Sequence, residues 1–334
     1  MEMQFNIIGD YAQILRERLR IRRYEECSID SIKDDYNLVL AYFGALRRMV
    51  SMVKRTVFKA NGFMCPQEYV SALAEIERKI ERGENINPYL SRKLRNLCAN
   101  DELLNDWGIQ HLHLGISVIT KKKNRGFIEG TPKLLFAYFD DQSAYFIVIG
   151  DHDSFGEAEL LQILHDNWPE VLEKSKNPNI RSVAPDHLTS KQRDQMRRAG
   201  YNMGANVMRD GTAYVMVGGG IMSSGDNTLD VYGTNRLHTW AHRQTNNLRD
   251  LAPEIVAELK RRHGLEVVEP ITLKLIVEGR SDSRWFLIDD NNHVTVGLGN
   301  PWEDRPPMIF YFFDDSTFIS RSSCTECRAS SASS

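Results

Sequence analysis

The chain has 334 residues, of which 42% are hydrophobic and 26% are charged, and its net charge is -3. This composition is typical of a soluble globular protein with two domains, and no apolar run approaches the ~20 residues of a membrane helix. The N-terminus lacks a basic segment followed by an apolar one, so we expect no secretory signal and a cytoplasmic protein without a membrane role. Among the five cysteines, Cys324 and Cys327 form a lone CxxC, which lacks the second ligand pair of a zinc site.

Residues 1–105 are predicted to form a helical N-terminal region. A first helix is expected around Leu15 and Leu19, and a long one from Ser31 to Phe58, started by Ser31 or Asp34. The apolar face of the long helix is formed by Leu38, Tyr42, Leu46, Met49 and Val53. Another helix is predicted from Pro66 to Arg82, stopped by Gly83, and a fourth over 87–99, with Arg92, Lys93 and Arg95 on an exposed arc.

Residues 106–176 are predicted to form a small antiparallel sheet followed by a helix. In the HLHLG segment, His111 and His113 are two residues apart, so they share one side of a strand. Two apolar runs, 134–139 and 144–149, flank acidic and polar turn residues, which is typical of a hairpin. We expect this hairpin and the HLHLG strand to share a sheet, with a helix following from Glu157 to Lys174.

Residues 185–310 are predicted to form a second domain, so the fold class is α+β. The turn-rich segment 176–179 is the expected linker, Thr189 or Ser190 is the expected helix cap, and Arg209-Asp210-Gly211 is a hairpin turn. The glycines at 218–220 lack the features of a phosphate-binding loop and are expected to be flexible. The HTWAH segment favours packing around Trp240. Strands are expected at 271–277, 285–288 and 294–298, and 311–334 is expected to be a C-terminal tail with a disordered end.

Basic residues and histidines converge on the segment between Asp106 and Asp153. Residues 1–150 hold 22 Lys and Arg against 19 Asp and Glu, so a polyanion partner is expected in this half. Basic side chains can neutralise phosphate while an imidazole transfers protons during metal-independent RNA cleavage. The candidate phosphate-binding residues are Lys121, Lys122, Lys123, Arg125 and Lys133, and the candidate catalytic residues are His152, His111 and His113.

The run LLFAYFDDQSAYFIVIGDHDSF resembles the C-terminal sheet of RelE/ParE-type bacterial toxins. In both, an apolar strand with aromatic residues, a short acidic hairpin and a second apolar strand lead into Gly-x-His-x-x-Phe. The resemblance covers about residues 107–156 and implies a small α+β fold and cleavage of messenger RNA without a cofactor. It also implies proton transfer by His152, phosphate binding by Lys133 or Arg125, and a role in a toxin-antitoxin or phage-defence system with a cognate inhibitor protein.

Other interpretations remain open for the same residues. His111, His113, Asp151 and His152 have the side chains that bind a divalent transition metal, which would make the chain a metal-dependent hydrolase. Alternatively, the histidines are structural and the basic loop is a solvated surface. A further alternative is a non-enzymatic interaction protein of a mobile element, which binds RNA or a protein without cleaving it.

Overall fold

The computed structural model describes residues 3–22, 24–121, 124–151, 158–180, 189–202, 204–263, 270–278, 282–292, 294–303, 308–312 and 315–321. Helices and strands combine in an α+β fold, as predicted. The chain divides into two compact units. We call Met1–Leu40 together with Tyr232–Ser334 the terminal unit, and Ala41–Val231 the central unit.

These units differ from the predicted division into 1–105, 106–176 and 185–310. The predicted N-terminal region is shared between the two units, and 106–176 belongs to the same unit as the segment that follows it. The physical reason is that residues of the segment from Ala72 to Leu90 share one apolar core with the sheet strands that follow residue 105.

A four-stranded sheet forms the centre of the central unit. Its strands are β2 (Thr56–Lys59), β3 (Ile109–His113), β4 (Leu134–Phe139) and β5 (Ser143–Gly150). The spatial order is β2-β5-β4-β3, with β2 parallel to β5 and the other pairs antiparallel. His111 pairs with Phe136 and Leu112 with Leu135, which confirms that the HLHLG strand and the hairpin share one sheet.

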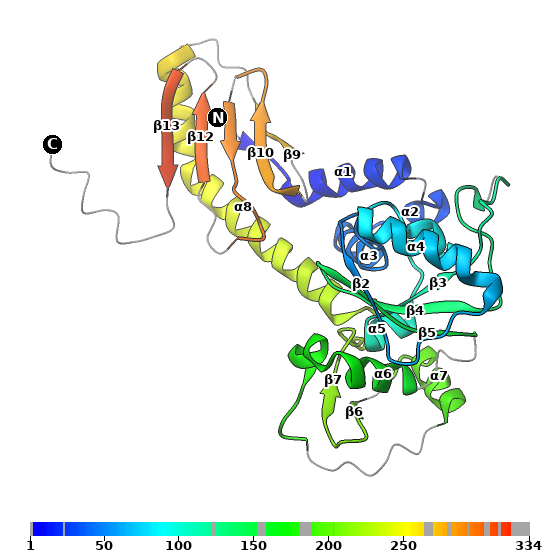
Figure 1. Ribbon diagram of the computed structural model, residues 1–334. Helices are drawn as coiled ribbons and strands as arrows, with labels where there is room; N and C mark the ends of the chain where they lie inside the picture. The colour runs from blue at the N-terminus through cyan, green and yellow to red at the C-terminus, as the bar shows by residue number, and fades with distance from the viewer. Residues whose placement is uncertain are drawn as a thin grey trace. The chain divides into compact units, whose positions relative to one another are not determined.

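Helices cover both faces of this sheet (Figure 1). Their bounds are η1 (Gln67–Tyr69), α4 (Val70–Arg82) and η2 (Asn87–Tyr89) for one face, and α5 (Glu102–Trp107), α6 (Glu159–Asn167) and η6 (Pro169–Ser175) for the other. Leu135 and Phe146 pack with α4, whereas Phe136 and Ile147 pack with α5 and α6. Because side chains alternate along a strand, Ile109, His111 and His113 share the face that α5 covers.

The predicted helix from Ser31 to Phe58 is wrong beyond Arg47. Helix α3 spans Asp35–Arg47, and the Asp34 side chain accepts a hydrogen bond from the Asn37 backbone amide at its start. Leu38 is buried as predicted, but Val53 is 42% exposed. Residues 56–59 form β2 instead, because pairing with β5 satisfies their backbone groups and overrides a helical apolar pattern.

Three other predicted segments also differ. Residues 87–99 form two short turns, η2 and η3 (Arg92–Arg95), in place of a helix. The Asn87 side chain bonds the backbone of Val50, which holds the start of η2. The helix predicted to Lys174 ends at Asn167, before Pro169, and η6 continues it. The expected linker lies inside the central unit, where the Asn177 amide donates to the Ala213 carbonyl.

The last part of the central unit follows the predicted turns. Helix α7 (Ser190–Arg198) begins with a capping box between Thr189 and Gln192. Strands β6 (Ala205–Val207) and β7 (Ala213–Val215) form the hairpin around Asp210-Gly211. The glycine loop expected to be flexible is buried, and the amides of Gly218 and Gly220 donate to the Asp106 and Asn105 carbonyls.

The terminal unit combines helices from both ends of the sequence with a five-stranded sheet. Its helices are α1 (Ile7–Ile21), α2 (Glu26–Ser31) and most of α8 (Thr228–His263), which runs through Pro253. The sheet has the order β13-β12-β11-β10-β9 and consists of β9 (Lys274–Glu278), β10 (Arg284–Asp289), β11 (Val294–Gly297), β12 (Met308–Phe312) and β13 (Asp315–Arg321). A parallel pair joins β1 (Met3–Gln4) to β8 (Ile271–Thr272).

The ring centroids of Trp240 and Trp285 lie 5.2 Å apart, so the HTWAH segment packs around Trp240.

The predicted C-terminal tail is wrong at its start, and residues 322–334 lie outside the described residues. Residues 311–312 belong to β12 and residues 315–321 form β13, because a neighbouring strand pairs with their backbone. Cys324 and Cys327 lie outside the described residues. Within the described part of the chain, no helix has the length and apolar composition to cross a membrane.

The contact of Gly218 with α5 gives a stability prediction. A Cβ atom at Gly218 would lie 2.1 Å from the Leu104 carbonyl oxygen and 2.6 Å from the Gly108 amide nitrogen. We therefore expect Gly218→Ala to lower the free energy of unfolding by about 1–3 kcal/mol or more, measured by urea denaturation. Gly130→Ala is the matched control, because the atoms nearest to its Cβ would belong to the His113 and Arg92 side chains, at 3.6 Å or more. Equal stability of the two variants would contradict this packing.

Candidate functional site

The structure places two of the three predicted histidines on the same side of β3. His111 is buried, and His113 is half-buried, with its Nδ1 accepting a hydrogen bond from the Thr131 amide at 3.2 Å. His152, Lys122 and Lys123 lie outside the described residues. The convergence of the three histidines therefore stays a prediction.

The structure describes the other predicted phosphate-binding residues, Lys121, Arg125 and Lys133. Lys121 and Arg125 are exposed on the segment between β3 and β4, and the Arg125 carbonyl accepts a hydrogen bond from Arg95. The Lys133 ammonium pairs with Asp151 at 3.3 Å, with both side chains about half exposed. An ion pair this exposed contributes little to stability, so phosphate could displace Asp151 from Lys133.

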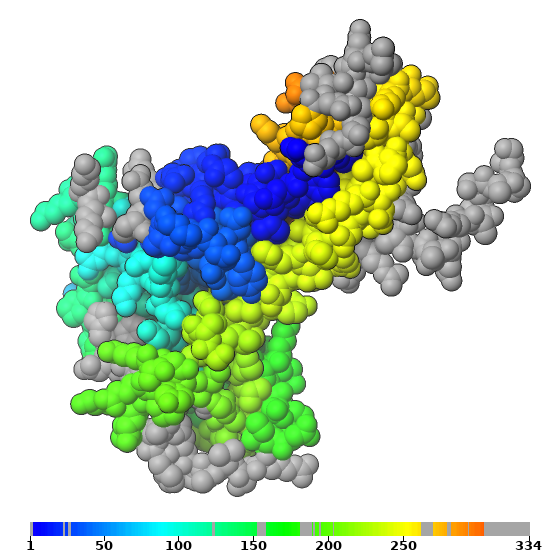
Figure 2. Space-filling model, turned by 180° about the vertical axis from the view of Figure 1, so that it is seen from behind, coloured from blue at the N-terminus to red at the C-terminus, as the bar shows by residue number. Residues whose placement is uncertain are grey.

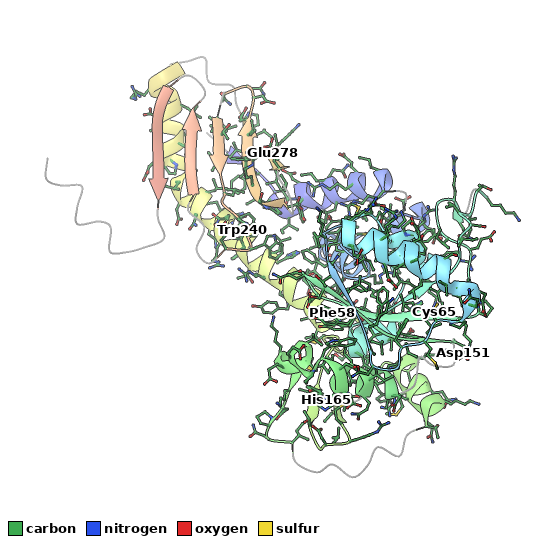
Figure 3. The ribbon with its side chains drawn as sticks, viewed as in Figure 1. Phe58, Cys65, Asp151, His165, Trp240 and Glu278 are labelled. Atoms are coloured by element: carbon green, nitrogen blue, oxygen red, sulfur yellow. The ribbon has the colours of Figure 1, made fainter. Side chains whose placement is uncertain are left out.

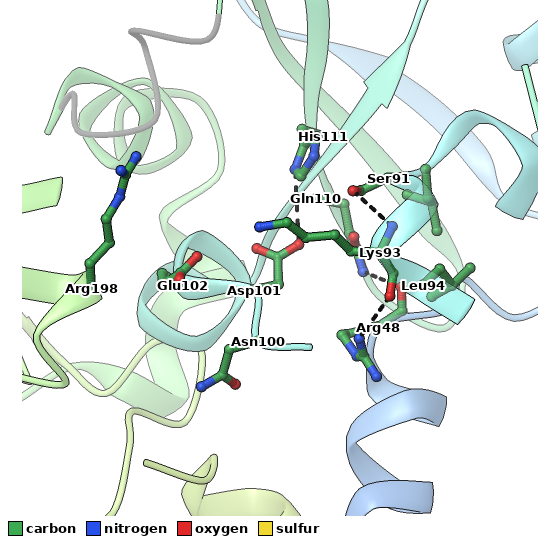
Figure 4. Close-up of a pocket in the computed structure, with 11 residues that line it drawn as sticks. Arg48, Ser91, Lys93, Leu94, Asn100, Asp101, Glu102, Gln110, His111 and Arg198 are labelled. Carbon is green, nitrogen blue, oxygen red and sulfur yellow. Dashed lines mark hydrogen bonds and ion pairs between the residues drawn. The ribbon is translucent and has the colours of Figure 1, made fainter. Parts of the chain in front are cut away.

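A cavity of about 350 Å³ opens beside His111 (Figure 4). It collects side chains from the end of α3, η3, the start of α5, strand β3 and the end of α7. The residues that give it charge are Arg48, Lys93, Asp101, Glu102, His111 and Arg198. The cavity thus brings an imidazole together with cationic and carboxylate groups.

His111 faces a carboxylate across this cavity. Its Nδ1 lies 3.9 Å from Asp101 Oδ2, and the side chains are 11% and 18% exposed. Asp101 is the N-cap of α5, and its other oxygen, Oδ1, accepts a hydrogen bond from the Leu104 amide at 3.1 Å. Helix capping therefore fixes the carboxylate that faces the ring, and a fixed carboxylate favours one orientation of an imidazole.

The cationic residues of the cavity have different roles. Arg48 is buried and donates to the carbonyls of Asn96 and Leu97, while its own carbonyl accepts a hydrogen bond from Gln110, so it is structural. The Lys93 side chain extends into the cavity toward Asp101 (Figure 4). Lys93 and Arg198 are largely exposed, and both line the cavity.

A basic strip continues from the cavity along η3. A Cβ atom at Gly130 would be 3.6 Å from His113 Cε1 and 3.9 Å from Arg92 Nη2, so both side chains lie over this glycine. The Arg95 guanidinium lies 4.9 Å from the centroid of the Phe127 ring. On the face shown in Figure 2, the cyan segment around residue 100 borders the green segment that contains α7.

His165 has a structural position in the same unit (Figure 3). Its Nδ1 is 2.9 Å from the Tyr214 hydroxyl, and its Nε2 is 3.3 Å from Asp210. Hydrogen bonds from Thr212 lower the pKa of Asp210, and burial raises the pKa of Tyr214. His165 thereby joins α6 to the hairpin of β6 and β7.

The predicted metal set is not assembled within the described part of the chain. No three His, Cys, Asp or Glu side chains come together there in a way that could hold a metal ion. Asp151 pairs with Lys133, and His152 lies outside the described residues. Metal binding by these residues therefore stays a prediction.

The sequence did not predict three residues of the cavity, Asp101, Lys93 and Arg198. Asp101 looks like an ordinary helix cap before Glu-Leu-Leu, and Lys93 like part of a solvated arc. Arg198 comes from a helix far along the chain, and only the packing of α7 against α5 brings it to the cavity. Comparison of the chain with family models, curated proteins and solved structures gives no match.

The double role of Asp101 can be tested by two substitutions. Asp101→Ala should lower the free energy of unfolding by about 1 kcal/mol, because α5 loses its cap. Asp101→Asn should cost less, since an amide oxygen still caps the helix while the charge facing His111 is removed. Urea denaturation of both variants measures the difference. If Asn and Ala are equally destabilising, capping is not the stabilising role of Asp101.

Proposed function

We propose that this chain is an RNA-directed, toxin-like protein that cleaves RNA without a metal at the cavity beside His111. The observation that carries the proposal is a buried imidazole facing a fixed carboxylate, in a cavity that Lys93 and Arg198 also line. Cleavage of RNA requires proton transfer at the ribose and neutralisation of the phosphate charge. The cavity contains side chains suited to both.

In the proposed reaction, the ribose 2′-oxygen attacks the adjacent phosphorus atom, and its proton passes to His111. The bond to the 5′-oxygen of the next nucleotide breaks, and that oxygen leaves as an alcohol after taking up a proton. Asp101 stabilises the imidazolium that forms, while Lys93 and Arg198 bind the phosphate oxygens. His152, which the toxin resemblance makes the proton-transfer group, is a second candidate for protonating the leaving oxygen.

The basic strip supports an extended polyanion as the substrate. Arg92, Lys93 and Arg95 follow one another on η3, and Lys121 and Arg125 lie on the segment that contacts it. A strip of this kind suits the regularly spaced phosphates of a single strand. Under this proposal, a cognate inhibitor protein would act by covering the strip or the cavity.

Substitution of His111 tests the catalytic role. His111→Ala and the bulkier His111→Gln should each reduce cleavage of labelled single-stranded RNA by about 100-fold or more, because the proton acceptor is lost. Binding of the same RNA should remain. His242→Ala is the matched control, since His242 is exposed on α8 and bonds only Asn246 among the described residues.

Three results would contradict this function. Loss of cleavage on addition of a chelator would favour the metal-dependent hydrolase. Normal cleavage by both His111 variants would place the chemistry elsewhere, and binding without any cleavage would favour the non-enzymatic alternative.

Substitution of Lys93 tests phosphate binding separately. Lys93→Ala should weaken RNA binding and reduce the slope of log affinity against log salt concentration by about 0.7, the value for one phosphate contact on a single strand. Lys54→Ala removes an exposed lysine that does not line the cavity and should leave the slope unchanged. Fluorescence anisotropy across a salt series measures both. Equal slopes for the two variants would show that Lys93 does not contact phosphate.

A further inference from the structure

A second cavity lies next to the first one. It has a volume of about 220 Å³ and extends from the start of α5 to the end of α7 and the glycine loop. Asn100, Glu102 and Arg198 line both cavities, so the two share a wall. The second cavity is of a size to hold a single planar ring system.

The walls of the second cavity are held in place by their own contacts. Arg197 donates to Asp106 at 2.8 Å and lies 4.0 Å from the centroid of the Trp107 ring, while burial raises the pKa of Asp106 against the opposing charge of Arg197. The Asn202 amide bonds both the amide and the carbonyl of Ile221, at 2.7 and 2.6 Å. These polar groups form hydrogen bonds within the protein, so they fix the shape of the cavity and are not the groups that would bind a ligand.

Two side chains of this cavity remain available to a ligand. Tyr201 is 62% exposed at the cavity, so its ring can stack on a planar group. No hydrogen bond or ion pair joins the half-buried Glu102 carboxylate to another residue in the described ranges. An ionised carboxylate only accepts hydrogen bonds, so it selects a ligand edge that offers donors.

Among the RNA bases, guanine alone offers two adjacent donors, N1–H and the 2-amino group, on its Watson–Crick edge. Adenine and cytosine place a ring-nitrogen acceptor beside their amino group, and uracil places two carbonyl oxygens beside its single N–H. A carboxylate therefore binds guanine with two hydrogen bonds and is repelled by an acceptor on the other bases. Single-stranded RNA can present this edge because its bases are not paired.

We propose that the second cavity binds a guanine base of single-stranded RNA, with Glu102 accepting from N1–H and the 2-amino group and Tyr201 stacking on the ring. The inference rests on the proposed function, because the adjoining phosphate would occupy the first cavity between Lys93 and Arg198. Arg198, at the boundary of the two cavities, would contact the backbone between base and phosphate. The chain would thus cleave RNA next to guanine.

Binding of defined oligonucleotides tests this assignment without relying on cleavage. In the full chain carrying His111→Ala, oligouridine with one central guanosine should bind about tenfold more tightly than the same strand with adenosine or cytidine there. Inosine, which lacks the 2-amino group, should fall between. Glu102→Gln should abolish the preference for guanosine, while the affinity for plain oligouridine stays the same or rises as a negative charge is lost. Glu129→Gln, an exposed carboxylate outside both cavities, is the matched control.

Tyr201→Ala should weaken binding of the guanosine strand but not of a strand with an abasic site at that position, because only the base stacks. Tyr232→Ala removes a similarly exposed tyrosine, 66% accessible, that lines neither cavity and should change neither affinity. RNA binding with no base preference, or a preference that survives Glu102→Gln, would overturn the guanine site while leaving the cleavage function intact. Guanosine-selective binding without cleavage in the unsubstituted chain would support the site and overturn the cleavage function. Absence of RNA binding would overturn both.

Discussion

An ion pair between the half-buried Arg47 and the buried Asp230 fixes the elements that carry both cavities. Arg47 Nε lies 3.0 Å from Asp230 Oδ1, and its Nη2 lies 3.0 Å from Oδ2 and 2.7 Å from Asn105 Oδ1. Asn227 donates to the same Asn105 oxygen at 3.3 Å. Loss of one partner from such a pair costs about 3–5 kcal/mol, because a buried charge is left uncompensated. The end of α3, the middle of α5 and the start of α8 are therefore held as one polar cluster.

This cluster determines where the start of α5 lies, and with it the two acidic residues of the proposed site. The Asn105 side chain donates to Asn100 at 3.1 Å, just before the helix begins. The glycine loop adds backbone bonds to the other end, and Gly218 leaves no room for α5 to shift toward it. The distance between Asp101 and His111, and the position of Glu102 between the cavities, thus depend on contacts that touch neither side chain.

The sequence predicted those elements whose own residues determine their conformation. Gly83 ends α4 with a φ of 70°, and the Asp210-Gly211 turn closes a hairpin, because these residues adopt backbone angles that most others avoid. Strand β2 could not be predicted from its neighbours. Its four residues come directly after a segment whose apolar residues have helical spacing. Only β5, much later in the chain, supplies the parallel partner that makes them a strand.

The proposed site was predictable only in part, for a related reason. His111 stands out in HLHLG, but the residues around it belong to segments that only the packed fold brings together. Asp101 shows most clearly why a sequence pattern is insufficient: one carboxylate oxygen caps α5 and the other faces the imidazole. The cap can be predicted from the neighbouring residues, whereas the contact with His111 exists only because β3 lies beside the start of α5. A residue with an evident structural role can therefore also belong to a site. The two roles of Asp101 can be distinguished only when the position of each carboxylate oxygen is known.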